Sequence, residues 1–229
     1  MSRFVLSLTV LLVCSLSGPL LAQDTRSVIH ESAQEVQPLL SGMKAPAFTV
    51  RDVEGNAVAI DPAKLEKPLV LTFYRGGWCP FCNLHLAEMR HAEKELNELG
   101  FDLWFISIDK PELLYASLQE PDTSYTIYSD SSLEATRAFG LAFKVDDATF
   151  ERYMGYGIDL EGASGETHHV LPAPATFIIG TNGIINFQYT NPEYTVRLHP
   201  DVLLAAARAY VADEDKRLIR AWKAKQKER

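Results

Sequence analysis

Two cysteines separated by two residues, Cys79 and Cys82, are the side chains of this sequence best suited to chemistry. They follow the glycine pair Gly76-Gly77, where a buried strand is expected to give way to a helix. A cysteine at such a junction meets the unpaired N–H groups of the helix start, which favour a thiolate over a thiol. Cys82 lies one helical turn later on the same side and can close a disulfide with Cys79. The spacing predicts a redox-active dithiol, with Cys79 partly exposed and able to attack.

The cysteine pair has two other possible uses, a stabilising disulfide and part of a structural zinc site. A disulfide closing so small a ring stabilises a fold little, by about 2 kcal/mol from loop closure. A structural zinc site needs about four ligands, and the sequence contains no second cysteine pair. Redox chemistry is therefore the favoured interpretation.

Composition and charge limit the classes of function. The chain has 229 residues, of which 47% are hydrophobic and 23% charged, as is usual for one globular domain. Its formal net charge of −8 is the opposite of the basic character of nucleic-acid binders. We therefore expect no nucleic-acid partner. Because no nucleotide, flavin or haem motif is present, we also expect no cofactor, with reducing power coming from another thiol protein or a small thiol.

The N-terminus has the pattern of an export signal. A single positive charge precedes the apolar stretch 4–16, and the small residue Ala22 offers a cleavage site. The apolar stretch is shorter than the roughly 20 residues that span a bilayer. A lipid anchor at Cys14 is disfavoured because Val13 precedes it, where small residues are usual. We predict a signal peptide over 1–22 and no stable membrane span, with a periplasmic location in a Gram-negative source and secretion otherwise.

The rest of the chain is divided into a lead-in segment over 23–41, one compact domain over 42–212 and a charged helix end over 213–229. The cations of that end suit the C-terminal dipole of its helix, so a solvated end is favoured over membrane contact. The segment 144–170 is expected to be irregular. Strands are expected at 48–50, 57–60, 69–74, 101–108, 125–128, 176–179 and 184–189, and helices after Gly77, from Asp109, at 131–139 and from Asp201 to about Gln226. This alternation predicts an α/β domain with helices on the faces of a sheet.

Three blocks of sequence carry a resemblance to a known family. They are residues 42–48, the Trp-Cys-Pro-Phe-Cys motif at 78–82, and residues 172–179 with the Asn182-Gly183 pair that follows. Over about 42–210 the chain resembles the thioredoxin superfamily, and within it the redoxin group of peroxiredoxins and alkyl hydroperoxide reductase or thiol-specific antioxidant proteins. It is most similar to the peroxiredoxin-like subgroup with a CxxC motif. The resemblance implies a thioredoxin-like fold, a central mixed sheet flanked by helices, with an N-terminal hairpin extension and an insertion before the late hairpin.

The chain departs from peroxiredoxins at the residues that activate peroxide. Superposed on their motif, the peroxide-reacting position falls on Cys82 and the threonine position on Cys79. Arg75 stands where the family has proline, and Pro174 stands where it has its downstream arginine. The thioredoxin set is kept instead, as CxxC and a proline, here Pro174, that in thioredoxins is cis and lies against the disulfide.

The resemblance implies a role for each residue of the motif. Cys79 is the nucleophile and Cys82 the resolving thiol, while Trp78 shields the pair and Arg75 stabilises a thiolate or is simply solvated. Pro80 suits the start of the helix. The predicted function is that of an exported thiol–disulfide oxidoreductase acting on protein or small-thiol substrates. The alternative is an antioxidant thiol peroxidase that reduces hydroperoxides.

A second alternative comes from His168 and His169, which precede the Pro174 loop. Two thiolates and an imidazole suit copper, so Cys79, Cys82 and one of these histidines could form a copper-binding assembly factor. The copper-delivery factors of this fold use CxxxC rather than CxxC, which favours a polar loop role for the histidines.

Four further residues have both a functional and a structural interpretation. Asp109 could accept a proton from Cys82 if it points inward, although helix capping is the commoner use of such a residue. His85 is expected on the surface, with an acid–base role as the alternative. Tyr153 and Tyr156 are expected to pack in the core, with a substrate rim as the alternative.

Overall fold

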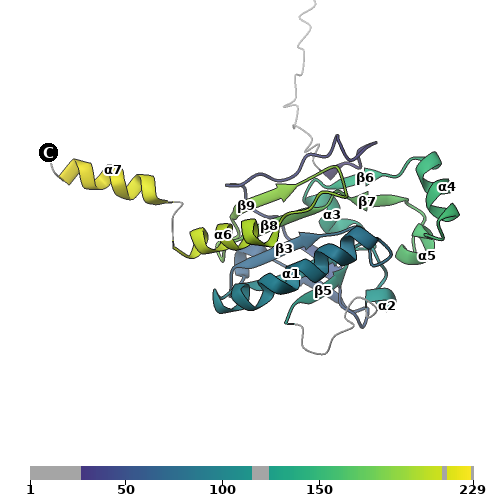
Figure 1. Ribbon diagram of the computed structural model, residues 1–229, viewed down its shortest axis with the longest axis horizontal. Helices are drawn as coiled ribbons and strands as arrows, with labels where there is room; N and C mark the ends of the chain where they lie inside the picture. Colours follow the sequence, from purple (N-terminus) through teal and green to yellow (C-terminus); the bar gives the residue numbers. More distant parts are fainter. Residues whose placement is uncertain (1–26, 115–123, 213–215, 228–229) are drawn as a thin grey trace, which may run out of the picture.

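The computed structural model describes residues 27–114, 124–212 and 216–227 (Figure 1). The expected signal peptide at 1–22 lies outside the described residues. Within them, no helix is both long and apolar enough to cross a membrane.

A seven-stranded sheet forms the centre of the domain, with the strand order β2-β1-β5-β4-β3-β8-β9. The neighbours β3, β4 and β5 run parallel, whereas β8 runs antiparallel to both β3 and β9. The sheet is therefore mixed, which confirms the predicted fold class. Its strands are β1 Phe48–Arg51, β2 Ala57–Ile60, β3 Leu69–Phe73, β4 Asp102–Ser107, β5 Thr126–Ser129, β8 Ala175–Ile179 and β9 Ile185–Thr190.

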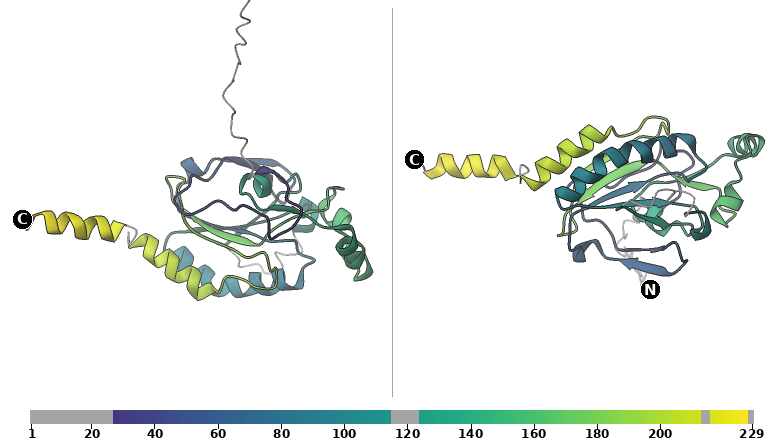
Figure 2. Two further views of the ribbon diagram at one scale, coloured as in Figure 1. Left: turned by 90° about the horizontal axis from the view of Figure 1, so that it is seen from above. Right: turned by 60° about the horizontal axis from the view of Figure 1, so that its bottom comes forward.

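Helices cover both faces of this sheet. The long α1, Pro80–Glu98, and α6, Pro200–Val211, pack side by side on one face, and the short α3, Glu134–Ala138, lies on the other beside β1 (Figures 1 and 2). On the apolar face of α1, Leu86, Met89 and Leu96 are buried, and Leu99 just after the helix is half-buried against the same core. Two short helical segments, η2 Pro62–Lys64 and α2 Pro111–Leu114, connect strands.

The central strand β3 is buried throughout because it separates two apolar cores. Val70 belongs to the core beneath α1 and α6, whereas Leu69, Leu71 and Phe73 belong to the core on the opposite face. This alternation explains why the strand is apolar at nearly every position rather than at every second one.

The segment 144–170 was expected to be irregular, and this expectation is wrong. It contains α4, Asp147–Gly155, and α5, Leu160–Ser164, and is bracketed by a small antiparallel sheet of β6, Ala142–Lys144, and β7, Val170–Pro172. The carboxylate of Asp146 caps α4 and that of Asp159 caps α5, each by accepting a backbone N–H bond. The helices are short and α4 buries no residue, so hydrophobic periodicity did not reveal them.

The end of the chain also differs from the expectation. Instead of one helix from Asp201 to about Gln226, the structure describes α6, which ends at Val211, and a separate α7, Arg217–Lys227. Helix α7 projects away from the body of the domain in every view of Figures 1 and 2.

Candidate functional site: a buried dithiol between two arginines

The connection from β3 to α1 places the cysteine pair at a helix start. The Tyr74 N–H continues the pairing of β3 by donating to Ile106 O at 2.9 Å, and the chain then turns through Gly76. Cys79 is the residue before the first turn of α1, with Pro80 in that turn as predicted. Gly76 has a φ of +152°, and a Cβ there would lie 2.3 Å from Nε1 of Trp78. Only glycine therefore fits this turn without displacing the tryptophan.

Both cysteines are free thiols and both are buried. Cys79 is 1% exposed and Cys82 is 0% exposed, so the expectation of a partly exposed Cys79 is wrong. The pKa of Cys79 is lowered to about 6, first because the Cys82 thiol donates a hydrogen bond to its sulfur and then because positive charge lies nearby. The pKa of Cys82 is raised, because burial and the neighbouring Cys79 both disfavour a second thiolate. The pair is therefore asymmetric, with Cys79 as the thiolate.

Arg75 supplies the first of these positive charges. Arg75 is 3% exposed, so the interpretation of Arg75 as a solvated surface charge is wrong. Its Nη1 lies 4.0 Å from Cys79 Sγ. Its guanidinium carbon lies 4.9, 5.3 and 4.1 Å from the ring centroids of Trp78, Tyr153 and Tyr194, and the guanidinium also donates to the Tyr153 hydroxyl. Aromatic faces attract a desolvated cation. Three rings thus hold Arg75 beside the sulfur.

The second positive charge, Arg197, was missed by the sequence analysis. Its Nη2 donates to Cys82 Sγ at 3.3 Å, although the two residues are 115 positions apart. Its Nε and Nη1 are buried and have no hydrogen-bond partner among the described residues. Arg197 lies in the connection between β9 and α6, where no motif or periodicity marks it, so no local signal could have identified it.

Asp109 approaches the same loop from the end of β4. It is 2% exposed, and its Oδ2 accepts hydrogen bonds from the Gly77 N–H at 2.7 Å and from the Ser107 hydroxyl at 3.0 Å. Burial raises its pKa to about 6, and the charge of Cys79 adds to that rise. The carboxyl therefore points inward, toward the cysteine loop, but its electrostatic partner is Cys79 rather than Cys82.

Trp78 and Pro174, the other two support residues expected from the sequence, both lie close to the β3–α1 connection. Trp78 is half-buried, packs against the core that contains both cysteines, and contacts the ring of Tyr153 on α4. Pro174 is buried next to β8, and the pairing of Phe73 with Ala175 sets it beside the end of β3. No peptide bond of the described residues is cis, so Pro174 differs from the thioredoxin proline in this respect.

His85 and Tyr156 lie in surroundings that differ from those expected. His85 was expected on the surface but is 5% exposed, and its Nε2 is 3.2 Å from Leu198 O. Burial, and then the charge of Arg197, lower its pKa to about 4, so it is neutral at ordinary pH. Tyr156 is 73% exposed, which excludes the expected core packing, whereas Tyr153 is half-buried at the site.

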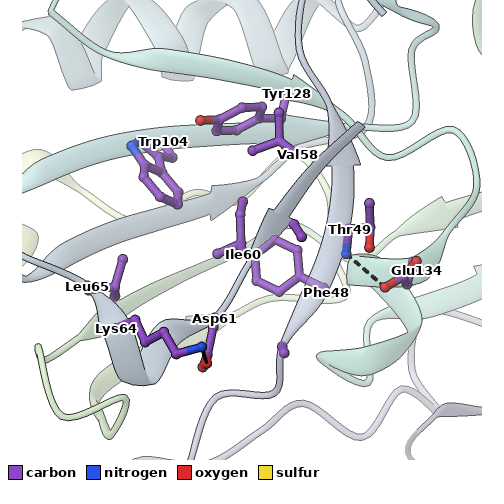
Figure 3. A pocket seen from close by; sticks show the side chains of 12 residues that line it. Phe48, Thr49, Val58, Ile60, Asp61, Lys64, Leu65, Trp104, Tyr128 and Glu134 are labelled. Carbon is purple, nitrogen blue, oxygen red and sulfur yellow. Dashed lines mark hydrogen bonds and ion pairs between the residues drawn. The ribbon is translucent and has the colours of Figure 1, made fainter. Parts of the chain in front are cut away.

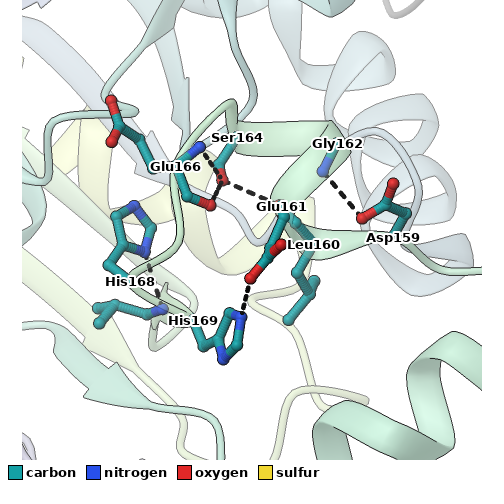
Figure 4. A network of polar contacts seen from close by, with 9 residues as sticks. Asp159, Leu160, Glu161, Gly162, Ser164, Glu166, His168 and His169 are labelled. Atoms are coloured by element: carbon teal, nitrogen blue, oxygen red, sulfur yellow. Dashed lines mark hydrogen bonds and ion pairs between the residues drawn. The ribbon is translucent and has the colours of Figure 1, made fainter.

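The two histidines of the copper hypothesis are engaged elsewhere (Figure 4). His168 Nδ1 accepts the Val170 N–H at 3.0 Å, and its Nε2 lies 3.1 Å from Ser131 O. His169 Nε2 lies 2.7 Å from Glu161 Oε1, and its ring stacks on Phe150. With one ring nitrogen accepting and the other donating, His168 has no lone pair left for a metal. Among the described residues, no group of three or more His, Cys, Asp or Glu is arranged to hold one.

A separate pocket lies between the β1–β2 hairpin and the strands β4 and β5 (Figure 3). Its volume is about 560 Å³, and Trp104 and Tyr128 lie on one side of it with Val58 and Ile60 of the hairpin on the other. None of the residues that surround the dithiol lines this pocket.

Comparison with known sequences identifies relatives among peroxiredoxins. Peroxiredoxin Q of the chloroplast of Suaeda salsa is 26% identical over 177 residues, which are 77% of this chain and 69% of that protein. Peroxiredoxin Bcp of Escherichia coli is 30% identical over 106 residues, 46% of this chain and 67% of that protein. A putative peroxiredoxin of Mycobacterium tuberculosis is 30% identical over 152 residues, 66% of this chain and 85% of that protein.

Solved structures share the fold at lower identity. Reduced Prx3 of Vibrio vulnificus, in complex with hydrogen peroxide, matches with a TM-score of 0.59 over 75% of this chain and 98% of that chain, at 16% identity. Peroxidoxin BcpB of Mycobacterium tuberculosis matches with a TM-score of 0.57 over 74% and 96%, at 20% identity. Both confirm the thioredoxin-like fold expected from the sequence. Residues 41–188 match the AhpC/TSA family, and the chain therefore belongs to that family of peroxiredoxin-type oxidoreductases.

Proposed function

We propose that this protein is a thiol peroxidase in which Cys79 reduces a hydroperoxide and the oxidised site is held as a Cys79–Cys82 disulfide. The observation that carries the proposal is a buried, free dithiol with a guanidinium group against each sulfur. Because the two cysteine residues are at most 1% exposed, a small hydroperoxide requires less opening of the site than a folded protein disulfide does. The membership of the family supports the same class of substrate.

The chemistry needs a thiolate and a stabilised leaving group. The Cys79 thiolate attacks the terminal oxygen of the hydroperoxide, the O–O bond breaks, and the alkoxide leaves and takes up a proton. Positive charge from Arg75 and Arg197 stabilises the negative charge that develops on the departing oxygen. The sulfur of Cys82 then attacks the sulfenic acid of Cys79, releasing water and forming the disulfide, which two external thiols reduce again.

The arginines do this from positions that differ from the family pattern. The expected downstream position is occupied by Pro174, and Arg197 instead reaches Cys82 from the connection before α6. Superposition of motifs assigns the first attack to Cys82, but we assign it to Cys79, since its pKa is lowered to about 6 and that of Cys82 is raised. The Cys82 thiol is then the resolving group, already hydrogen-bonded to its target sulfur.

A second function, disulfide exchange with a thiol protein or a small thiol, is favoured by one observation. The cysteine at the start of α1 has the lowered pKa and the second cysteine the raised one, which is the asymmetry that a CxxC exchange site requires. This function needs the site to open, because neither sulfur is exposed enough for another protein to reach.

One kinetic experiment separates the two functions. Reduced protein is mixed with hydrogen peroxide, with an organic hydroperoxide and with oxidised glutathione, and the fluorescence of Trp78 beside the pair reports disulfide formation. We expect hydroperoxides to react several orders of magnitude faster than a free thiol does, and the disulfide substrate to react slowly. A hydroperoxide rate no higher than that of free cysteine, together with rapid reaction with the disulfide, would replace the first proposal by the second.

Export is also part of the proposal. The pattern at 1–22 supports it, and the mature chain would then begin at Gln23. Expression of the whole chain in a Gram-negative host, followed by intact-mass measurement of the periplasmic fraction, tests this. A protein that retains residue 1 and stays in the cytoplasm would refute export without affecting the chemistry of the dithiol.

A further inference from the structure

Helix α7 is the part of the described chain with the least protection from solvent. It projects from the domain in Figures 1 and 2, and every side chain described in it is exposed. Three of these side chains are large and apolar: Leu218 is 69% exposed, Ile219 is 55% exposed and Trp222 is 62% exposed. The described residues of the domain leave them uncovered, and apolar side chains gathered on one exposed helix mark a surface for contact.

The three apolar side chains occupy one side of the helix. Leu218 and Trp222 are four positions apart, and Ile219 and Trp222 are three apart, so they are neighbours on one face. At about 100° per residue, Arg220 and Lys227 lie on the opposite side, whereas Lys223 and Lys225 border the apolar stripe on its two edges. The helix has no acidic residue, and its cations are Arg217, Arg220, Lys223, Lys225 and Lys227.

The charge of α7 is opposite to that of the whole chain, whose formal net charge is −8. An anionic surface therefore attracts this helix while it repels the rest of the protein. Tryptophan adds a preference for the boundary between lipid headgroups and acyl chains. An apolar stripe with tryptophan, bordered by lysines and opposed by further cations, is the pattern of helices that lie in the plane of a bilayer surface.

We propose that α7 is a peripheral membrane-binding helix that inserts Leu218, Ile219 and Trp222 into the surface of a bilayer containing anionic phospholipids. The lysines that border the stripe then reach the phosphate groups, and the helix lies along the surface without crossing the bilayer. Because one short helix provides both contacts, the binding is reversible and depends on salt. This inference goes beyond the redox function and does not depend on it.

Vesicle sedimentation of the full chain tests the role of charge. We expect the protein to sediment with vesicles of phosphatidylglycerol and phosphatidylcholine, and much less with phosphatidylcholine alone or in high salt. The double variant K223E/K227E should bind at least about 25-fold more weakly, at about fivefold for each cation removed. The control is K94E on α1, a lysine whose side chain is 87% exposed but lies on the domain, and it should bind as the unchanged chain does.

A second measurement locates the apolar stripe and is independent of any binding by residues 1–22. Phospholipids brominated in their acyl chains quench tryptophan fluorescence on contact. We expect quenching in the unchanged chain and its loss in W222F, because the remaining Trp78 and Trp104 lie in the domain. The variant V211Q, which removes an apolar side chain 50% exposed at the end of α6, is the control and should still be quenched.

Three results would overturn the proposal. The first is equal sedimentation with anionic and neutral vesicles by both the unchanged chain and K223E/K227E. The second is quenching that persists in W222F. The third is a dimer, seen by light scattering without lipid and dissociated by W222Q, because the stripe would then be covered by a second copy of the chain.

Discussion

Arg75 and Arg197 each bring a guanidinium group to one sulfur of the dithiol, but the two regions that hold them are built differently. Arg75 comes from the motif itself, and three aromatic rings and the Tyr153 hydroxyl surround its charge, so that only its Nε is buried without a partner among the described residues. Arg197 comes from the connection between β9 and α6, and its contact with Cys82 leaves Nε and Nη1 without a partner among the described residues.

This difference indicates two different tasks. Arg75, held by three rings and a hydroxyl, is suited to stabilising the resting thiolate of Cys79. A cation with two buried donors unused has hydrogen bonds to offer to oxygen atoms that arrive with a substrate. We therefore assign the resting thiolate to Arg75 and the developing charge on the departing oxygen mainly to Arg197.

The largest expected effect comes from separating the two sulfurs. The rate constant of C79S with hydroperoxide should be at least about 1,000-fold lower, because the attacking thiolate is gone. C82S should keep the first step and stop at a sulfenic acid on Cys79, which intact-mass measurement detects as one added oxygen. The opposite pattern, with C82S inactive and C79S oxidised by one oxygen, would assign the attack to Cys82 and reverse the roles of both arginines.

Replacing each arginine by methionine tests whether the two side chains have different tasks. R197M should slow the hydroperoxide reaction by about 10- to 100-fold with little change in the pKa of Cys79, because it removes donors for the developing oxyanion. R75M should raise the pKa of Cys79 more, since its charge acts on that sulfur more strongly than that of Arg197 does. Stopped-flow rates and the ultraviolet absorbance of the thiolate against pH measure the two effects.

The control for these variants is R152M, an exposed arginine on α4, which should behave as the unchanged protein. If R75M and R197M shifted the pKa of Cys79 equally and slowed the reaction equally, the two arginines would share one task and the distinction between them would be wrong.

The pH dependence sharpens the assignment of the thiolate. The reaction rate should rise about tenfold per pH unit below the Cys79 pKa of about 6 and become constant above it. Since this pKa is lowered from 9.0, the thiolate also adds stability, which is present above pH 9 and is lost as the pH falls through 6. The difference in free energy of unfolding between reduced protein and C79S, measured in urea, should therefore increase from pH 6 to 9. A constant difference would show that Cys79 is not the thiolate.

The smallest expected effect concerns the link between α4 and Arg75. Y153F keeps the ring but removes the hydroxyl that accepts the hydrogen bond of Arg75, so the hydroperoxide rate should fall by about fivefold, as for one hydrogen bond of about 1 kcal/mol. Y156F changes a tyrosine that is 73% exposed on the same segment and should leave the rate unchanged. If Y153F and Y156F lowered the hydroperoxide rate equally, the rate would depend on the stability of the α4 segment and not on the hydrogen bond to Arg75.

Several features of the site could be predicted because they depend on neighbours in the sequence. The apolar run of β3, the glycines after it and Pro80 at the start of α1 together predict a cysteine at a helix N-terminus, and the structure has it there. The Asn182-Gly183 turn likewise predicts the hairpin of β8 and β9. Hydrophobic periodicity, turn residues and helix starts are local properties, so a single sequence contains them in full.

The surroundings of the dithiol were decided by the tertiary structure. Burial of Cys79, Arg75 and His85 depends on which segments cover them, and these segments are α4 and the connection before α6. The sequence by itself determined the thiol pair, its spacing and its place at a helix start. Only the folded chain determined which thiol is ionised and which cations serve it, because charges act through distance in space, and residues 115 positions apart come within 3.3 Å.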